Sequence, residues 1–427
     1  MDNNEERTLT PKSPESESLA EDARDGAAKD MPQGDKGQLP ESAPEATPKE
    51  EKKKKGCLKR MLLWTLLVLV SLSLAIVIAG VLYLRLPKFG ALPEGERLER
   101  VQSSPHYRDG KFQNIHPTGE VVNPDRKDRS LLDFFFRKGR LEPKEPLPAV
   151  KSDLKGLSEG QIVWFGHSSF LLKLGGRHFL VDPVLSVHAS PTGFGVTAFK
   201  GTSIYAAEDF PYIDYLLISH DHWDHLDYPT IMALKPTIGK VVCGLGIGAH
   251  FERWGFPSDS LLEDEWGHEF RPEPSLSIRI MYARHFSGRG LKWNQAMWAG
   301  FLIEAGGLRV FYSGDGGYAS HFAEAGEEFG PFDLALLEDG QYDLAWHDIH
   351  MLPEETVQAA LDLRAKAAIP VHNSKFNIAY HDWDDPLVRA RRSANEKGVN
   401  LLTPIIGQIL DIAAPMGAQD QWWAGRE

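Results

Sequence analysis

The stretch His220-Asp221-His222-Trp223-Asp224-His225 directly follows an almost wholly apolar run, residues 213–219. Such a run predicts a strand that is buried on both faces. His220 and His222 are two residues apart, so both can point the same way at the end of that strand. Imidazoles and carboxylates are the nitrogen and oxygen ligands that zinc binds. The stretch therefore predicts a metal site at the edge of a sheet, with a His-rich surface loop as the alternative.

Three further polar residues follow predicted strands later in the chain. His285 follows the run 277–282, Asp315 follows 308–313, and His372 follows 367–371. Each residue taken alone is more often structural than a ligand. Taken together and in this order, they complete a binuclear centre in which a carboxylate can bridge two ions. The predicted ligands are His220, His222 and His285 at one metal, Asp224, His225 and His372 at the other, and Asp315 shared.

Short apolar runs bounded by Gly, Pro and Asp predict the rest of the fold. The runs 162–165, 169–174 and 178–181 come first, with Gly175-Gly176 as a hairpin turn. Strands then alternate with helices, of which 353–364 is the clearest because Pro353 and two acidic residues open it. This order predicts two mixed sheets with helices outside. Later strands are expected at 241–244, 277–282, 298–304, 308–313, 333–337 and 367–371.

The N-terminal part has a different character. Residues 1–60 contain no Phe, Trp, Tyr, Ile or Val, which predicts a disordered tail. The run 61–84 has no charged residue and is long enough to span a bilayer as a signal anchor. A cleaved signal peptide or a buried core helix fits this length less well. Lys and Arg are more frequent before the run than after it, which predicts an N-terminus in the cytoplasm and the following domain on the extracytoplasmic side.

The composition narrows the class of protein. The chain has 427 residues, 42% of them hydrophobic, and a formal net charge of −13. This acidic balance argues against nucleic acid as the main partner. Two cysteines cannot form a disulfide scaffold. The expected organisation is a cytoplasmic tail (1–60), the transmembrane anchor (61–84), an extension packing on the following domain (85–157), the domain with the predicted metal site (158–412) and a C-terminal tail (413–427).

The His-x-His-x-Asp-His motif with the later His, Asp and His resembles the metallo-β-lactamase superfamily over about residues 160–412. Within it, the chain is similar to the N-acylphosphatidylethanolamine-hydrolysing phospholipase D family and its bacterial relatives. The shared stretches are 181–183, 189–191, 217–228, 314–318, 329–335 and 350–355. The resemblance implies an α/β fold, a four-layer αβ/βα sandwich with metals at one edge. The segment 373–376 departs from the Trp-Gly-Thr-Phe of the mammalian enzymes, which leaves headgroup and acyl preference open.

The chemistry expected of such a site is hydrolysis by a hydroxide that bridges two divalent ions. Zinc (Zn²⁺) is the first expectation, and Mn²⁺ or Fe²⁺ would suit the same ligands. Asp224 is both a ligand and the candidate that manages the proton. His350 would orient a phosphate oxygen or protonate the leaving alkoxide, or else be structural. Asp182 would orient a ligand imidazole, or else be a turn residue before Pro183.

Three functions remain open from the sequence. The first is a membrane-anchored phosphodiesterase of the phospholipase D type, whose partner is a membrane phospholipid substrate and whose anchor is residues 61–84. The second is a hydrolase of a small soluble substrate such as a lactone. The third is a non-catalytic metal-binding or assembly protein. Other histidines have no comparable pattern and are expected to be structural or exposed; they include His167, His188, His321, His347 and His381.

Overall fold

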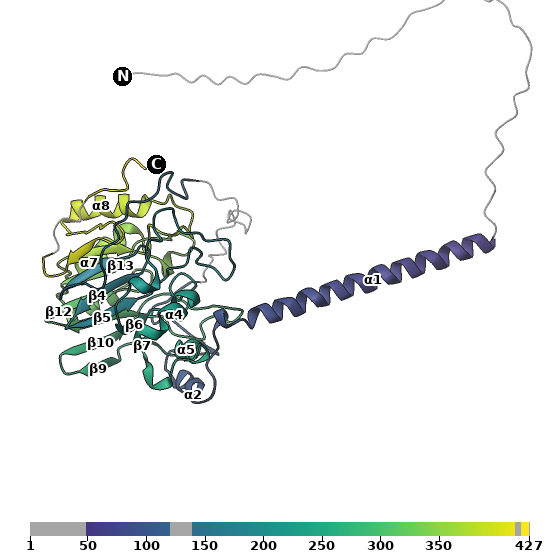
Figure 1. Ribbon diagram of the computed structural model, residues 1–427, viewed down its shortest axis with the longest axis horizontal. Helices are drawn as coiled ribbons and strands as arrows, with labels where there is room; N and C mark the ends of the chain where they lie inside the picture. The colour runs from purple at the N-terminus through teal and green to yellow at the C-terminus, as the bar shows by residue number, and fades with distance from the viewer. Residues whose placement is uncertain (1–47, 120–138, 415–419, 427) are drawn as a thin grey trace, which may run out of the picture. The chain divides into compact units, whose positions relative to one another are not determined.

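The computed structural model describes residues 48–119, 139–414 and 420–426 (Figure 1). The chain divides into two compact units, 1–74 and 75–427. Helix α1 spans Pro48–Leu84, and its part from residue 52 is long and apolar enough to cross a membrane. Of the expected disordered tail, 1–60, residues 1–47 lie outside the described part of the chain. Its last residues, 48–60, are helical instead, because Lys and Glu are good helix formers and continue the apolar helix.

The extension after α1 packs on the domain over its described part. It contains a short 3₁₀ turn η1 (Pro87–Phe89), helix α2 (Gly95–Ser103) and a hairpin of β1 (Tyr107–Arg108) and β2 (Lys111–Phe112). Val101 of α2 and Phe112 of β2 are fully buried and share a cluster with Trp298. These apolar contacts fix the extension against the domain.

Two mixed sheets form the body of the domain. The first has the order β15-β3-β4-β5-β6-β7-β8, and the second the order β14-β13-β12-β11-β10-β9. The strands of the first sheet are β3 (Gln161–Trp164), β4 (Phe170–Leu174), β5 (Arg177–Val181), β6 (Ile213–Ile218), β7 (Ile238–Gly244), β8 (Leu261–Asp264) and β15 (Ile409–Asp411). Those of the second are β9 (Glu269–Glu273), β10 (Leu276–Met281), β11 (Gly300–Ala305), β12 (Leu308–Tyr312), β13 (Leu334–Glu338) and β14 (Ala368–Val371).

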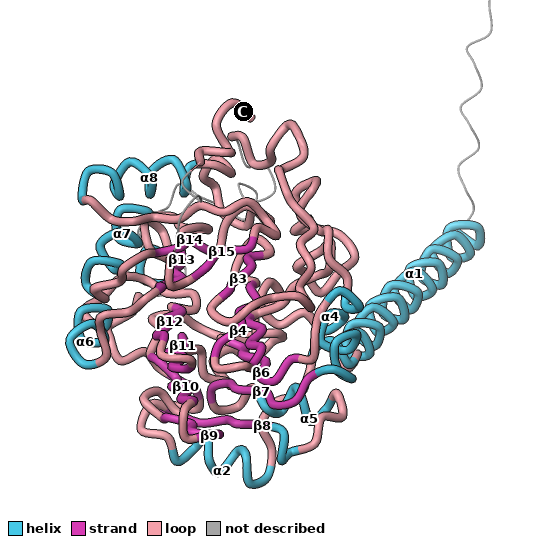
Figure 2. Tube along the Cα trace, turned by 60° about the vertical axis from the view of Figure 1, so that its left-hand side comes forward, coloured by secondary structure: helices cyan, strands magenta, loops and turns pink. Residues whose placement is uncertain are grey.

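Helices cover the outer face of each sheet, as Figure 2 shows. Helices α4 (Tyr228–Leu234) and α5 (Gly248–Arg253) pack on the first sheet, and α6 (His321–Glu328), α7 (Pro353–Asp362) and α8 (Asp385–Lys397) pack on the second. Between the sheets lies the main core, to which both contribute buried side chains such as Phe170 and Phe301. The predicted four-layer αβ/βα sandwich is confirmed.

The expected C-terminal tail, 413–427, includes residues that belong to the packed domain. Trp423 is buried in a cluster with Phe199, Trp383 and Leu387. An indole of this size buried against α8 stabilises the end of the chain on the domain.

The strand register brings the polar loops to one edge. β5 pairs in parallel with β6, and β12, β13 and β14 pair in parallel in turn. Parallel strands present their carboxyl ends at the same edge of a sheet, which is where ligand sites form. The loops that begin with Asp182, His220 and His372 leave from such ends.

Candidate metal centre

A first cluster of three imidazoles lies at the end of β6. Nε2 of His220 is 2.8 Å from Nδ1 of His222, and Nε2 of His285 is 3.3 Å from that same Nδ1. Nδ1 of His285 lies 3.0 Å from the carbonyl oxygen of Ile349, to which it donates, so its Nε2 is left for the cluster. Three nitrogens that converge in this way can hold one divalent ion.

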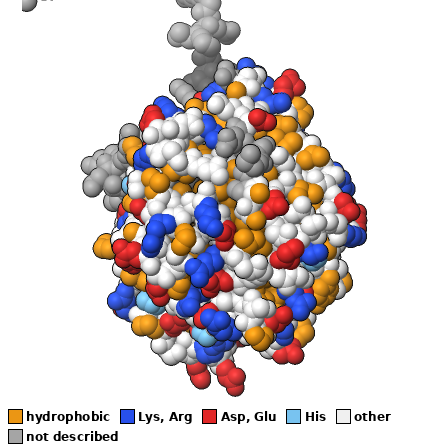
Figure 3. All heavy atoms as spheres, turned by 90° about the vertical axis from the view of Figure 1, so that its left-hand side faces the viewer, with side chains coloured by type: hydrophobic (Ala, Val, Ile, Leu, Met, Phe, Trp, Pro, Cys, Tyr) orange, Lys and Arg blue, Asp and Glu red, His pale blue; other side chains and the backbone are white. Residues whose placement is uncertain are grey.

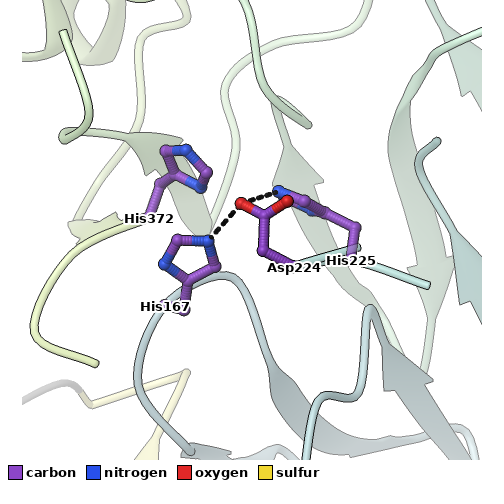
Figure 4. A group of neighbouring side chains, drawn as sticks. All are labelled: His167, Asp224, His225 and His372. Carbon is purple, nitrogen blue, oxygen red and sulfur yellow. Dashed lines mark hydrogen bonds and ion pairs between the residues drawn. The ribbon is translucent and has the colours of Figure 1, made fainter. Parts of the chain in front are cut away.

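A second cluster lies beside the first and is drawn in Figure 4. Oδ2 of Asp224 is 3.6 Å from Nε2 of His225 and 2.9 Å from Nε2 of His167. The candidate ligand atoms of these three residues and of His372 all lie within 4.8 Å of one another. A carboxylate with converging imidazoles matches the ligands of a second divalent ion.

Asp315 lies between the two clusters. Its Oδ2 is 3.0 Å from Nε2 of His225 and 3.2 Å from Nε2 of His372. The same oxygen is 3.9 Å from Nε2 of both His220 and His285. The carboxylate is therefore within reach of both groups of nitrogens, and all seven residues predicted as ligands are brought together.

The protonation of the clusters suits cation binding. Burial lowers the pKa of His220, His285 and His372 well below the usual value, and that of His222 to about 4. These imidazoles are therefore neutral at neutral pH, which is the form that binds a metal. Burial lowers the pKa of His225 as well, but Asp315 and Asp224 outweigh it and raise that pKa well above its usual value.

Two buried atoms at the centre support the fit of a cation. Oδ1 of Asp315 has no hydrogen-bond partner among the described residues, and Nε2 of His225 has none with hydrogen-bond geometry, although Oδ2 of Asp315 lies 3.0 Å from it. Leaving such atoms without a partner costs about 1–3 kcal/mol each. A divalent cation coordinated by these atoms would satisfy them, so the donor set fits the group.

Comparison with known proteins identifies the family. A model described as "Beta-lactamase superfamily domain" matches residues 177–373. A Mycobacterium tuberculosis protein is 36% identical over 331 residues, which cover 75% of this chain and 88% of that protein. The chain belongs to the metallo-β-lactamase superfamily. This makes it a metal-dependent hydrolase by family.

Two other relatives of this superfamily member carry more specific names. "N-acyl-phosphatidylethanolamine-hydrolyzing phospholipase D 1" of Caenorhabditis elegans is 32% identical over 222 residues, 49% of this chain and 62% of that protein. "Outer membrane protein RomA" of Klebsiella pneumoniae is 57% identical over 97 residues, 23% of this chain and 74% of that protein.

Asp182 accepts hydrogen bonds from the metal loop, residues 219–226, which follows β6. Its Oδ2 accepts hydrogen bonds from Nδ1 of His225 at 2.9 Å, from the Tyr312 hydroxyl at 2.6 Å and from the Ser219 hydroxyl at 2.5 Å. Its Oδ1 accepts from the Ser219 amide at 2.8 Å. A carboxylate on Nδ1 turns Nε2 of His225 toward the centre.

His350 reaches the opposite side of the centre. Its ring lies 5.0 Å from that of His285, and its Nδ1 is 2.5 Å from Oε1 of the fully buried Glu338. Oε2 of Glu338 accepts from the amides of Gly316 and Met351 at 3.1 and 3.2 Å. Glu338 therefore fixes the orientation of His350, a contact that the sequence did not indicate.

His167 was expected to be structural or exposed, and this expectation is incomplete. The side chain is fully buried, bonds Asp224, and lies with its ring 4.1 Å from that of His372. The available signal was its position, because Gly166-His167 follows the strand β3 as the other site residues follow theirs. Asp224 and His167 are far apart in sequence, so residue spacing does not show the contact.

One ligand candidate is partly exposed to solvent. The ligand candidates are buried except His222, which is partly exposed with its neighbour Trp223. The Phe286 ring lies 4.4 Å from that of His222, and the Phe89 ring 5.2 Å from that of Trp223. His222, beside Phe286, is therefore the ligand candidate nearest to solvent.

Proposed function

We propose that this hydrolase is a membrane-anchored, binuclear phosphodiesterase of the phospholipase D type that acts on phospholipids such as N-acylphosphatidylethanolamine. The observation that carries the proposal is the position of Asp315, whose Oδ2 lies 3.0–3.9 Å from imidazole nitrogens of both clusters. Support for the lipid substrate comes from the similarity to the Caenorhabditis elegans phospholipase D and from the apolar helix α1. The N-terminus is proposed to be cytoplasmic and the domain extracytoplasmic.

The proposed ligands are His220, His222 and His285 for one ion, and Asp224, His225 and His372 for the other, with Asp315 shared. When bound, two divalent ions, first of all Zn²⁺, would supply an acidified water and offset the negative charge on a phosphate. Asp224 would take the proton of the attacking water and share it with His167, 2.9 Å away. His350, oriented by Glu338, would protonate the leaving alkoxide.

The test uses the full chain in detergent micelles with an N-acylphosphatidylethanolamine. We expect about two metal ions per chain by mass spectrometry, and release of phosphatidic acid. His222→Ala should lose metal and activity together, since it removes one converging nitrogen. His268→Ala is the matched control, because His268 is outside the clusters and its side chain is 41% exposed.

Two results would overturn the proposal. Two metals without lipid turnover, but with turnover of a soluble lactone, would favour the small-substrate hydrolase. A folded protein that stays metal-free after incubation with Zn²⁺, Mn²⁺ or Fe²⁺ would contradict the binuclear centre.

A further inference from the structure

We propose that the loops 186–196 and 286–295 form a membrane-contact face around the end of α1, so that the metal centre opens toward the lipid surface. This membrane-contact face rests on the membrane anchoring in the proposed function, and it specifies which surface of the domain meets the bilayer. The occupant of this face is the same bilayer that α1 would cross.

The tips of both loops expose large apolar side chains. Leu291 is 85% exposed and Phe194 is 73% exposed. Among the described residues, no other large apolar side chain is as exposed as these two, those of α1 included. Trp293 and Val187 add exposures of 55% and 50%. Apolar side chains gathered at one face mark a contact with lipid or protein.

The charges of the two loops favour lipid. Neither loop contains Asp or Glu, although the whole chain carries a net charge of −13. Loop 286–295 contains the exposed Lys292, its other cation Arg289 being buried, and Lys88 reaches the other loop. By contrast, acidic and basic side chains are interspersed on the face drawn in Figure 3. Exposed apolar tips with lysine and without acids suit a surface of phosphate headgroups.

Both loops meet the last turn of α1. The Tyr83 hydroxyl donates to the carbonyl oxygen of Pro191 at 2.6 Å, and Nζ of Lys88 donates to the same oxygen at 2.5 Å. On the other side, a cavity of about 250 Å³ is lined by Leu84, Leu291 and Lys292. The loops thus flank the point at which the chain leaves the apolar helix. If α1 crosses a bilayer, these loops lie at its surface.

A line of aromatic rings joins this face to the metal centre. The Trp293 ring is 5.5 Å from that of Phe286, which lies 4.4 Å from the ring of His222. His222 is the partly exposed member of the proposed ligands. A phospholipid could therefore present its phosphodiester at the centre while its acyl chains stay in the bilayer.

The experiment places a fluorescent probe on single cysteines of the full chain in nanodiscs of phosphatidylcholine and phosphatidylglycerol. Cys57→Ser removes the exposed thiol, and Cys243 is fully buried and so does not label. Probes go on Phe194→Cys and Leu291→Cys. Ile76→Cys reports on α1, and Val388→Cys on α8, 45% exposed, is the matched control. Lipids with a nitroxide on the acyl chain act as quenchers.

We expect the nitroxide lipids to quench the fluorescence of the probes at positions 194, 291 and 76. The fluorescence of the probe at position 388 should not change. Quenching at 76 but not at 194 and 291 would overturn the membrane-contact face and leave the anchor intact. No quenching at 76 would refute the anchoring itself, and the face with it. If 194 and 291 are shielded from both the nitroxide lipid and aqueous iodide, a protein covers the face and the proposal is wrong.

A second readout separates this face from a structural role. The Phe194→Ser/Leu291→Ser double variant should show a raised KM on vesicles and an unchanged rate on a short-chain, water-soluble phospholipid. An equal loss on both substrates would contradict the proposal. Absence of turnover by the unmutated chain on either substrate would count against the phosphodiesterase and leave the quenching result standing.

Discussion

Nη1 of Arg289 donates a hydrogen bond to the backbone carbonyl of Asp221 over 3.0 Å and a second to that of Leu226 over 2.6 Å. Its Nε and Nη2 both donate to the carbonyl of Lys88. The ring of Trp223 covers the guanidinium at 4.0 Å. Burial lowers the pKa of Arg289 to about 10, so the group stays charged at neutral pH. The buried guanidinium of Arg289 therefore links Lys88, in the segment after α1, to Asp221 and Leu226 in the loop that carries the proposed metal ligands.

Replacing this guanidinium by an ammonium should loosen both segments. Arg289→Lys keeps the charge but loses the planar fork that serves three carbonyls at once. We expect a loss of about 2–3 kcal/mol in the free energy of unfolding, because buried carbonyls lose partners. Urea unfolding of the full chain in micelles measures it. Arg271→Lys, at a side chain 61% exposed, is the control, and equal stability of the two variants would contradict this role.

The carboxylate of Asp182 should govern metal affinity through His225. Asp182→Asn keeps the size of the side chain but replaces one carboxylate oxygen by an NH₂ group, which can only donate. That group would face donors that now bond the carboxylate, namely Nδ1 of His225, Ser219 or Tyr312. We expect metal affinity at the second cluster to fall about 10–100-fold. Competition with a chelator measures the affinity. Tyr312→Phe, which removes a single donor, should have a smaller effect; an unchanged affinity in both variants would refute the orienting role.

Glu338 should act on turnover through His350. Glu338→Gln cannot accept hydrogen bonds at both ends of its side chain, so His350 and the Gly316 amide compete for one oxygen. We expect kcat to fall about 10–100-fold while KM and metal content change little. Steady-state kinetics on the phospholipid, together with metal analysis, measure this. Glu324→Gln at the surface is the control, and a wild-type kcat would show that His350 needs no such partner.

His321 should make the domain sensitive to acid. Burial, with His116 and Arg284 nearby, lowers the pKa of His321 to about 3, from 6.5 when unfolded. Between these values the unfolded chain binds the additional proton, so stability rises with pH up to about 6.5 and is lost as the pH falls below it. From pH 7.5 to 5.5 this amounts to a loss of about 1.4 kcal/mol.

His321→Phe should remove that loss, because the ring packs on Phe322 and Tyr282 and needs no charge. Unfolding free energies of both proteins at the two pH values measure the difference. His268→Phe, at a side chain that is 41% exposed, is the matched control variant. Identical pH profiles for His321→Phe and wild type would contradict the prediction.

The sequence predicted most of the central strands, because their apolar runs are continuous and bounded by turn residues. It missed the two-residue strands β1 and β2 and three edge strands of the main sheets. These are β8, whose four residues are mostly half-buried, β9, whose residues Glu269–Glu273 are partly exposed, and β15, which has only three residues. Edge strands of this kind leave little periodic signal. The end of the disordered tail was also misplaced, since helical Lys and Glu residues continue α1 back to Pro48.

The ligand candidates were predictable because each follows a strand and belongs to a residue type that binds metals. Their supporting partners were not. Glu338 meets His350 because the loop after β13 folds back on the end of its own strand. His167 meets Asp224 because β3 and β6 run in the same direction, which brings the loops after them to one edge of the sheet. These contacts depend on tertiary register, which spacing along the chain does not contain.

The hydrogen bonds of Arg289 reach backbone oxygens alone, and this has an evolutionary consequence. The carbonyl of residue 88 is present whatever side chain stands there, so mutations at that position leave the bond intact. Natural selection on the contact between residues 88 and 289 should then preserve Arg289, while the side chain at position 88 is free to vary.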